Sequence, residues 1–296
     1  MDLLNILSLF DGISCGQIAL NHAGIEYDNY YASEINDKSI SVTQRNYSDT
    51  VQLGDVSKIS KKDISELNKI DLLIGGSPCQ NLSRTVINNV KHNQGLKGDK
   101  SQLFYEYVRI LELTKPKYFL FENVESMKSE DRDVITEALN VDPIMINSSL
   151  VSAQYRKRYY WTNIPNVTQP EDKKLLLKDI VLSEFDDKYW YNQDFTYHGE
   201  EKRPVATLHI NGHDILKRVY GLNQKSPSLT GCRGGNHQKK VYQYGKCRKL
   251  TPLEYERLQT VPEGYTEGFA DTHRYNMLGD GWTCSVISHI FKGLKL

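Results

Sequence analysis

The chain has 296 residues, of which 39% are hydrophobic and 25% are charged, so its composition is that of a globular protein and excludes a disordered or fibrous one. Lysine plus arginine and aspartate plus glutamate both number 37, so net charge indicates no class of partner. A nucleic-acid-binding surface would need basic residues that cluster locally. No apolar run approaches the roughly 18 residues of a membrane-spanning helix. The opening MDLLNILSLF lacks the basic region of a secretory signal.

Short apolar runs alternate with helical patterns along the first half of the chain. In chain order, the expected elements are a strand at 4–9, a helix at 15–23, a strand at 29–33, a helix at 37–45, a strand at 70–74, a helix at 101–113 and a strand at 118–121. This alternation predicts an α/β fold with a Rossmann-like, mostly parallel sheet that has helices on both faces. Ligands of such folds bind at the carboxyl ends of the strands.

The pattern weakens after Pro165. Residues 166–245 hold short, tyrosine-rich, strand-like pieces and many turn residues, and helical patterns return at 252–258 and 286–291. We therefore expect a first domain made of residues 1–165 plus 265–296, and a second, smaller, irregular domain over residues 166–264.

The first expected strand runs into Phe10-Asp11-Gly12-Ile13-Ser14-Cys15-Gly16 and then a helix. Glycines let such a turn approach a ligand, although many strand-to-helix turns carry two glycines for steric reasons alone. Glu34 follows the second strand, where a carboxylate can accept hydrogen bonds from ribose hydroxyls. Asp55 falls where a third strand would end and could accept from an adenine amino group. These strand ends favour a nucleoside-containing cofactor, and the lack of a G-x-x-x-x-G-K-[ST] sequence argues against ATP or GTP.

Gly75-Gly76-Ser77-Pro78-Cys79-Gln80 closes the next buried strand. A thiol at such a strand end becomes reactive when a following helix or positive groups favour its thiolate. The alternative is a buried structural cysteine in a Gly-Pro turn, and we favour the reactive thiol. The other four cysteines, at 15, 232, 247 and 284, form no CxxC pair, so we expect reduced thiols and neither a zinc site nor a disulfide framework. The polar segment 81–100 is typical of a loop that closes over a substrate.

Phe121-Glu122-Asn123-Val124 closes the following strand. An acid at the end of an apolar strand tends to have a raised pKa, which suits proton donation. The alternative is an acid at a helix N-terminus. Gln154-Tyr155-Arg156-Lys157-Arg158 supplies two arginines at i and i+2, which share a face if the segment is extended. One of them could reach an anionic or carbonyl oxygen of a substrate, and the alternative is a solvated basic edge strand.

These motifs, in this order, resemble those of the S-adenosylmethionine-dependent DNA cytosine-C5 methyltransferases. The resemblance covers residues 4–165 and 246–291 and rests on FDGISCG, GDV, GGSPCQ, FENV, QYRKR, RKLTPLEYERLQTVPEGY and LGDGWTCSVI. Some segments are similar to the animal de novo branch, and the whole looks like a compact prokaryotic or phage enzyme. Three segments depart from the family pattern: F-x-G-x-G reads FDGIS, G-N-S-V reads GDGW, and a Thr-Leu pair reads Ser228-Leu229.

The resemblance implies covalent catalysis on a cytosine flipped out of duplex DNA. Cys79 would add to C6, so that C5 can attack the methyl group of S-adenosylmethionine and leave S-adenosylhomocysteine. Glu122 would hydrogen-bond or protonate N3, Arg158 would hold the O2 side, and Arg156 is the other arginine of the catalytic set. The implied cofactor contacts are Phe10, Asp11, Gly12, Ser14, Glu34, Ile35, Asp55, Val56, Pro78, Leu103, Trp282, Ser285 and Val286. No metal is expected.

The expected DNA contacts are Gln80, Ser83, Ser228, Arg233, Lys239 and Lys240. Most of them fall in residues 215–253, which contain no acid and nine basic residues, namely Lys217, Arg218, Lys225, Arg233, Lys239, Lys240, Lys246, Arg248 and Lys249. We expect this segment to form the main DNA-facing strip, with a solvated basic face as the alternative.

The implied setting is the cytoplasm of a prokaryotic or phage-infected cell, with the enzyme on duplex DNA and a restriction endonuclease as the partner that such a system can include. Two other functions stay open. A transfer-RNA cytosine-C5 methyltransferase would share the fold and chemistry, but its Pro-Pro-Cys and Cys-Phe-Thr motifs are absent. A catalytically inactive DNA-binding paralogue should have lost Cys79, Glu122 or the cofactor turn, and all remain.

Overall fold

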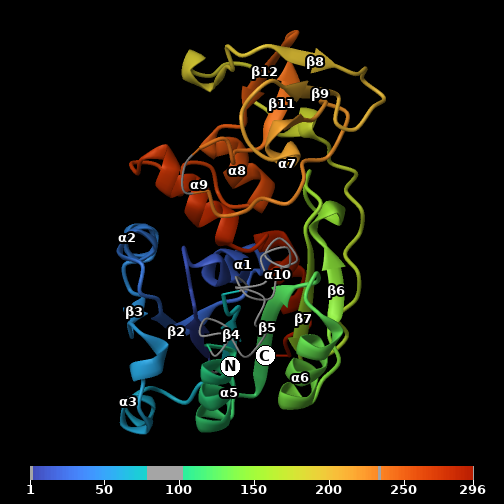
Figure 1. Ribbon diagram of the computed structural model, residues 1–296. Coiled ribbons are helices and arrows are strands. Elements are labelled where there is room, and N and C mark those ends of the chain that lie inside the picture. Colours follow the sequence, from blue (N-terminus) through green and yellow to red (C-terminus); the bar gives the residue numbers. More distant parts are fainter. Residues whose placement is uncertain (1–2, 79–102, 233–234, 296) are drawn as a thin grey trace. The chain divides into compact units, whose positions relative to one another are not determined.

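The computed structural model describes residues 3–78, 103–232 and 235–295, and its elements are labelled in Figure 1. The chain divides into two compact units. Unit 1 comprises Met1–Ile146, Lys157–Gln169 and Ile287–Leu296, and unit 2 comprises Asn147–Arg156 and Pro170–Val286. In the described ranges, no helix combines the length and the apolar character needed to cross a membrane.

The described part of unit 1 is built on a seven-stranded sheet with the order β3-β2-β1-β4-β5-β7-β6. The strands are β1 (Leu4–Leu9), β2 (Tyr27–Ser33), β3 (Val51–Gln52), β4 (Leu72–Gly75), β5 (Tyr118–Val124), β6 (Ile144–Asn147) and β7 (Lys157–Thr162). β1 pairs in parallel with β2 and β4, and β4 pairs in parallel with β5. β7 runs antiparallel to β5. The predicted α/β class with a mostly parallel sheet is confirmed.

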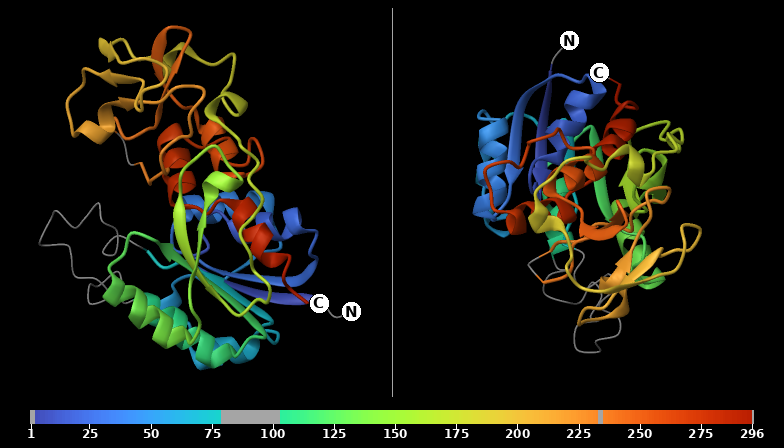
Figure 2. Two further views of the ribbon diagram at one scale, coloured as in Figure 1. Left: turned by 90° about the vertical axis from the view of Figure 1, so that its right-hand side faces the viewer. Right: turned by 90° about the horizontal axis from the view of Figure 1, so that it is seen from above.

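Helices cover both faces of this sheet, as Figure 2 shows. They are α1 (Cys15–Ala23), α2 (Asp37–Asn46), α3 (Lys61–Glu66), α5 (Leu103–Thr114) and α6 (Ser129–Leu139), with a short 3-10 turn, η1 (Val56–Lys58). Helix α10 (Cys284–Phe291) runs across the boundary between the units. Strand β1 and helix α1 have the bounds that their sequence patterns predict, whereas α3 and α6 had not been predicted.

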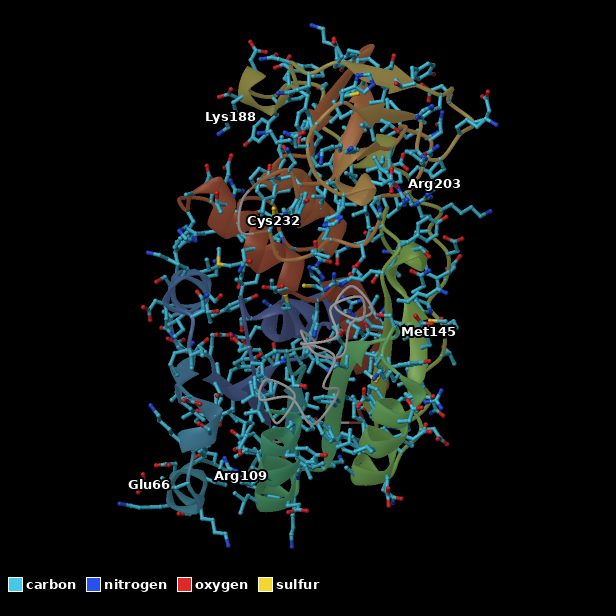
Figure 3. All side chains as sticks on the ribbon, viewed as in Figure 1. Glu66, Arg109, Met145, Lys188, Arg203 and Cys232 are labelled. Atoms are coloured by element: carbon cyan, nitrogen blue, oxygen red, sulfur yellow. The ribbon has the colours of Figure 1, made fainter. Side chains whose placement is uncertain are left out.

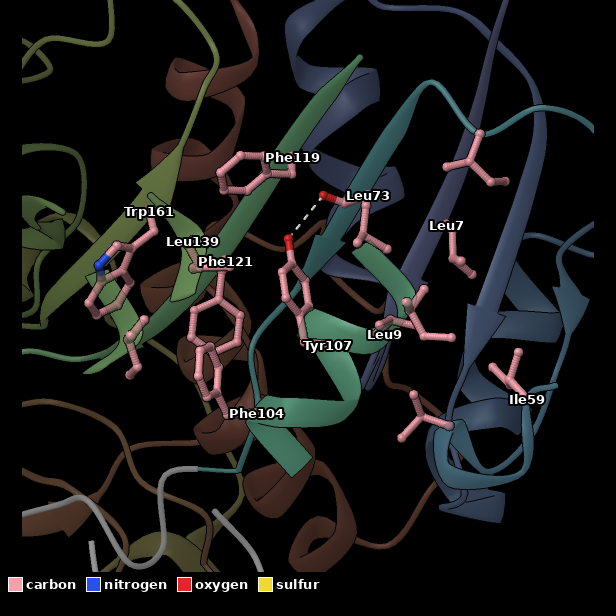
Figure 4. Close-up of a cluster of buried hydrophobic side chains, with 14 of the residues drawn as sticks. Leu7, Leu9, Ile59, Leu73, Phe104, Tyr107, Phe119, Phe121, Leu139 and Trp161 are labelled. Carbon is pink, nitrogen blue, oxygen red and sulfur yellow. Dashed lines mark hydrogen bonds between the residues drawn. The ribbon is translucent and has the colours of Figure 1, made fainter. Parts of the chain in front are cut away.

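A hydrophobic core of unit 1 lies between the sheet and α5 (Figure 4). Phe121 of β5 packs at a tilt against Tyr107 and Phe104 of α5, with ring centroids 4.8 and 5.3 Å apart. The Tyr107 hydroxyl donates to the carbonyl of Leu73 at 3.4 Å. A Cβ on Gly75 would lie 3.0 Å from the Tyr107 ring, so glycine at the end of β4 lets α5 sit close to the strand that leads to Cys79.

Unit 2 contains short elements and, in its described part, two small antiparallel sheets, β10-β9-β8 and β11-β12. Its elements are η3 (Ser148–Leu150), η4 (Leu177–Asp179), η5 (Asp187–Tyr189), β8 (Phe195–Tyr197), β9 (Ala206–Leu208), α7 (Asp214–Lys217), β10 (Arg218–Val219), β11 (Lys240–Gln243), β12 (Lys246–Lys249), α8 (Pro252–Gln259) and α9 (Asp271–Asp280). A small core gathers Val205, Ala206, Leu208, Val219 and Cys247.

The compact units differ from the expected domain bounds at three places. Residues 147–156 cluster with unit 2, residues 166–169 cluster with unit 1, and the return to unit 1 occurs at Ile287, where we had expected it at 265. The late return agrees with the packing of α9 against α8. Tyr255 and Tyr275 meet edge to face at 4.7 Å, and Gln259 donates to the carbonyl of Leu278 at 2.6 Å.

Candidate functional site

The turn between β1 and α1 contains three residues with left-handed backbone conformation. Phe10, Gly12 and Ser14 have φ of 58°, 60° and 59°. The Ser14 amide donates to the carbonyl of Asp11 at 3.0 Å, and the Asp11 amide donates to the carbonyl of Ser33 at 3.1 Å. Left-handed conformations outside glycine cost free energy and are concentrated at functional sites. The turn that the sequence predicted to face a ligand thus has a constrained backbone, and its role stays a prediction.

Glu34 fastens this turn to the loop that follows β2. Its Oε2 accepts from the Gly12 amide at 2.8 Å, and its Oε1 accepts from the amides of Ile35 and Asn36, each at 2.8 Å. A carboxylate offers about four acceptor sites. Glu34 can therefore hold the turn and still accept hydrogen bonds from a ligand, while the neighbouring Ile35 side chain is 74% exposed.

Asp55 lies after β3, at the start of η1. Its Oδ1 accepts from the hydroxyl of Ser57 at 2.8 Å and from the amide of Ser57 at 3.0 Å. These bonds lower the pKa of Asp55, so the carboxylate stays ionised at neutral pH. Arg109 of α5, labelled in Figure 3, donates to the carbonyl of the buried Val56 at 2.9 Å and holds this turn in place.

The segment that leads to Cys79 is bonded to the end of β5. Asn123 donates from Nδ2 to the carbonyl and the hydroxyl of Ser77, both at 3.3 Å. The β4–β5 register, which pairs Gly75 with Phe121, brings these two residues together. Pro78 is the last described residue before a gap, and Cys79, Gln80, Ser83 and Arg233 lie outside the described residues. Leu103, at the start of α5, is half-buried against the core.

Glu122 and Arg158 form an ion pair across β5 and β7. The distance from Arg158 Nε to Glu122 Oε1 is 2.8 Å, and the two side chains are 15% and 11% exposed. Glu122 lies opposite Tyr160 in the antiparallel register, so Arg158, two residues away, is its diagonal neighbour on the same face. The structure thus brings together two predicted catalytic residues that are 36 positions apart in the sequence.

Arg156 has different partners from Arg158. It belongs to unit 2, is 4% exposed, and donates to the carbonyl of Leu229 at 2.7 Å and to that of Gly281 at 2.9 Å. The hydroxyl of Ser228 lies 3.4 Å from the same guanidinium. The two arginines would share a face only in an extended strand, and this condition is not met because β7 begins at residue 157. Arg156 ties together segments of unit 2.

Trp282, Ser285 and Val286 lie at the end of unit 2. The Ser285 amide donates to the hydroxyl of Thr260 at 2.8 Å, and the Val286 side chain is fully buried. In the same motif, a Cβ on Gly279 would overlap the carbonyl of Thr230, so glycine is required there. The cofactor contacts expected of these residues remain predictions.

Three basic residues of the expected DNA-facing strip point inward. Arg248 is fully buried and pairs with Glu254 at 2.5 Å. Lys240 is 2% exposed and donates to the carbonyls of Asn236 and Gln238, and burial lowers its pKa to about 7. Lys225 donates to the carbonyls of Ser149 and Leu175, among others.

The prediction of one continuous DNA-facing strip is therefore wrong for Lys225, Lys240 and Arg248. Their charged groups form hydrogen bonds with carbonyls, or an ion pair with a carboxylate, inside unit 2. Lys239 is half-buried, and burial lowers its pKa to about 8.

The sequence analysis also missed a basic cavity of about 650 Å³ in unit 2. It is lined by His198, Lys202, Arg203, Pro204, Thr207, Asp214, Arg218 and Tyr220. The Arg203 guanidinium, labelled in Figure 3, lies over the rings of Tyr155 and Tyr220, at 4.5 and 5.3 Å from their centroids. Its residues form no contiguous motif, so nothing in the sequence pointed to it.

The acidic groups around the first turn fit the expected cofactor. S-Adenosylmethionine carries ribose hydroxyls, an adenine amino group and two positive charges. Glu34 and Asp55 offer carboxylates at neighbouring strand ends. Asp11 adds a third, whose Oδ2 is buried without a hydrogen-bond partner among the described residues. A cluster of acids favours a cationic nucleoside over an anionic nucleotide.

Comparison with known proteins assigns a family. The sequence profile of the C-5 cytosine-specific DNA methylases matches residues 4–296. The orphan methyltransferase M.SPRI of Bacillus phage SPR is 27% identical over 279 residues, which cover 78% of this chain and 61% of that protein. M.Rho11sI of Bacillus phage rho11s is 33% identical over 255 residues, which cover 77% of this chain and 48% of that protein. The chain thus matches about half to three fifths of the length of these two relatives.

A third relative and two solved structures match over nearly the whole chain. M.SPBetaI of Bacillus phage SPbeta is 24% identical, with 99% of this chain and 98% of that protein covered. The Entamoeba histolytica methyltransferase EhMeth has a TM-score of 0.73 at 20% identity, with all of both chains covered. Spodoptera frugiperda DNMT2 has a TM-score of 0.71 at 18% identity, with 98% and 99% covered. At these identities the structures show the fold alone.

Proposed function

The chain belongs to the C-5 cytosine-specific DNA methylase family, and we propose that it methylates C5 of a flipped-out cytosine in duplex DNA, with S-adenosylmethionine as methyl donor. The observation that carries the proposal is the Glu122–Arg158 ion pair at the strand end beside the Ser77-Pro78 segment. It sets an acid and a guanidinium at the strand end to which Asn123 ties Ser77. The phage relatives M.SPRI and M.Rho11sI are named methyltransferases, which supports the same activity.

Cys79 is the proposed nucleophile. Its thiolate forms a bond to C6, and the electron pair of the C5–C6 double bond moves to C5, which takes the methyl group. Loss of the C5 proton to a base and breakage of the bond from sulfur to C6 restore the double bond and the thiolate. Glu122 is proposed to bind N3 of the ring, where negative charge would otherwise build up, and Arg158 to hold Glu122 and the O2 side.

The cofactor is proposed to bind along the carboxyl ends of β1, β2 and β3. When bound, S-adenosylmethionine supplies the electrophilic methyl group. Glu34 is proposed to accept from the ribose hydroxyls and Asp55 from the adenine amino group. The left-handed turn leaves backbone groups for the amino-acid end. The remaining proposed contacts are Phe10, Gly12, Ser14, Ile35, Val56, Pro78, Leu103, Trp282, Ser285 and Val286.

Unit 2 is the proposed DNA-recognition part of the enzyme. The proposed contacts there are Ser228, Arg233 and the half-buried Lys239, to which Gln80 and Ser83 are added from the segment after Cys79. The relatives M.SPRI and M.Rho11sI are named orphan methyltransferases, which supports an enzyme that acts without a companion endonuclease. We propose the same here in place of the expected restriction partner.

A methyl-transfer assay with labelled S-adenosylmethionine tests the proposal directly. Duplex DNA should accept label, and transfer RNA at the same nucleotide concentration should not. Bisulfite sequencing of DNA from an expressing host should then show 5-methylcytosine in one sequence context. Labelling of transfer RNA alone would identify an RNA methyltransferase. Labelling of neither, with an intact Cys79, would identify a binding protein.

A further inference from the structure

The carboxyl group of Asp11 is enclosed beneath the turn that joins β1 to α1. The residue is 8% exposed. The Tyr30 hydroxyl of β2 donates to its Oδ1 at 2.8 Å, whereas Oδ2 is buried without a partner among the described residues. An ionised carboxylate that is buried and incompletely hydrogen-bonded is costly.

The groups that act on Asp11 within the described residues include no cation. Burial is the largest influence and raises the pKa of Asp11 to about 6, and the negative charge of Glu34 raises it further. Hydroxyl groups partly offset this, and they come from Ser8, Tyr30 and Ser14. Burial raises the pKa of the Tyr27 phenol, which is also on β2, and the negative charge of Asp11 raises it further. The carboxyl group of Asp11 thus lies near a second acid, Glu34, and near the phenols of Tyr27 and Tyr30.

On the basis of the proposed cofactor, we propose that Asp11 couples the binding of S-adenosylmethionine to the release of a proton. In the free enzyme the buried carboxyl keeps its proton in mildly acidic solution. A positively charged ligand held over the turn stabilises the ionised form and expels that proton. The coupling makes the cofactor site sensitive to pH just below neutrality.

The sign of the effect follows from the charges. An opposite charge within about 4–6 Å lowers the pKa of a carboxyl by about 1 to 3. The bound enzyme therefore holds fewer protons than the free enzyme between pH 4 and 7, roughly, and the affinity for the cofactor falls as the pH falls. With a bound-state pKa about 2 lower, the dissociation constant rises about tenfold from pH 7.5 to pH 5.

Calorimetry in buffers of different ionisation enthalpy measures the number of protons released per bound ligand. At pH 6 the wild-type chain should release about half a proton for each S-adenosylmethionine bound, because Asp11 is then about half protonated. Asp11→Asn should release close to none and should bind with an affinity that changes little with pH. Asp28→Asn, which alters an exposed acid on the same strand as Tyr30, should behave like the wild type.

A neutral ligand provides the second arm and needs no variant. 5′-Methylthioadenosine retains the nucleoside but lacks both positive charges, so its binding to the wild-type chain should release no proton at pH 6. Equal proton release by this ligand, or proton release that persists in Asp11→Asn, would overturn the inference. Pronounced binding of S-adenosylmethionine without any proton release would do the same and leave the proposed function intact. Absence of cofactor binding at every pH would instead contradict the proposed function.

Discussion

The carboxylate of Glu122 is positioned by its ion pair with Arg158 on the neighbouring strand. Arg158 holds the carboxylate at 2.8 Å, and antiparallel pairing with β7 fixes the arginine. The sequence predicted both residues from the FENV and QYRKR motifs. It could not predict their contact, because an antiparallel register depends on which strand edges meet.

Glu122→Gln keeps the size of the side chain but removes the charge and the exchangeable proton. We expect the single-turnover rate of methyl transfer to fall about 10²-fold or more, since a positioned acid or base contributes about that much. Rapid-quench measurement with saturating cofactor and DNA tests this. Glu125→Gln, a substitution of a half-buried acid just beyond β5, is the control and should leave the rate unchanged. A wild-type rate in Glu122→Gln would limit Glu122 to a structural role.

Glu34→Ala removes three backbone hydrogen bonds and the proposed ribose acceptor. Hydrogen bonds to a charged group contribute about 1.5–3 kcal/mol each, so binding of S-adenosylmethionine should weaken at least about tenfold. Calorimetry measures the change, and circular dichroism checks the fold. Glu26→Ala, at an exposed acid just before β2, should bind normally. Unchanged affinity in Glu34→Ala would refute this placement of the cofactor.

At the scale of elements, the buried Arg248–Glu254 pair joins β12 to α8. Glu254 also caps α8, accepting from the Thr251 amide at 2.6 Å, and accepts from the Leu182 amide at 2.8 Å. The sequence motif RKLTPLEYERL contains all of these residues except Leu182, yet the charge of Arg248 suggested a DNA-facing surface. The sequence shows that a residue is basic, but only its packing in the fold shows whether its charged group reaches solvent.

Glu254→Gln should destabilise the protein by about 3–5 kcal/mol, because it leaves the buried Arg248 guanidinium without a counter-ion. Asp214→Asn breaks the exposed Arg218–Asp214 pair and should cost no more than about 1 kcal/mol. Urea denaturation of both variants provides the comparison. Equal, small losses of stability would show that the buried pair does not hold unit 2 together.

The sequence predicted the strands and helices with strong hydrophobic periodicity and missed those with weak periodicity. β1 and α1 were predicted with the observed bounds. Helix α6 was missed because its segment SEDRDVITEAL has only two buried residues, Ile135 and Leu139, in the structure. Helix α9, which packs on α8, was missed as well, and the return to unit 1 comes after it, at Ile287.

At the scale of the whole molecule, DNA binding should depend on basic groups that reach solvent. Lys239 and Lys240 are adjacent but differ in burial, which makes them a matched pair. Removing one phosphate contact flattens the slope of log affinity against log salt by about 0.9. We expect this flattening of the slope for Lys239→Ala. For Lys240→Met we expect an unchanged slope and lower protein stability, because the Lys240 amine donates to two backbone carbonyls. The reverse pattern would place Lys240 on the DNA.

The proposed catalytic residues could be named from sequence because covalent chemistry demands particular residue types at particular strand ends. The network that surrounds them could not. The Tyr30–Asp11 bond and the Arg203 cavity join residues that share no motif, and they arise only when β2 meets β1 and when loops of unit 2 close together. Contacts of this kind depend on the tertiary fold.

The central claim is that Cys79 is the covalent nucleophile of a DNA cytosine methyltransferase. A duplex with 5-fluorocytosine at the target position tests it, because fluorine at C5 cannot be eliminated after methyl transfer and the adduct persists. With S-adenosylmethionine present, the wild-type chain should form a denaturant-resistant protein–DNA adduct whose mass includes the methyl group. Cys79→Ser should form none while it still binds the cofactor. Adduct formation by Cys79→Ser, or none by an active wild-type enzyme, would contradict the account.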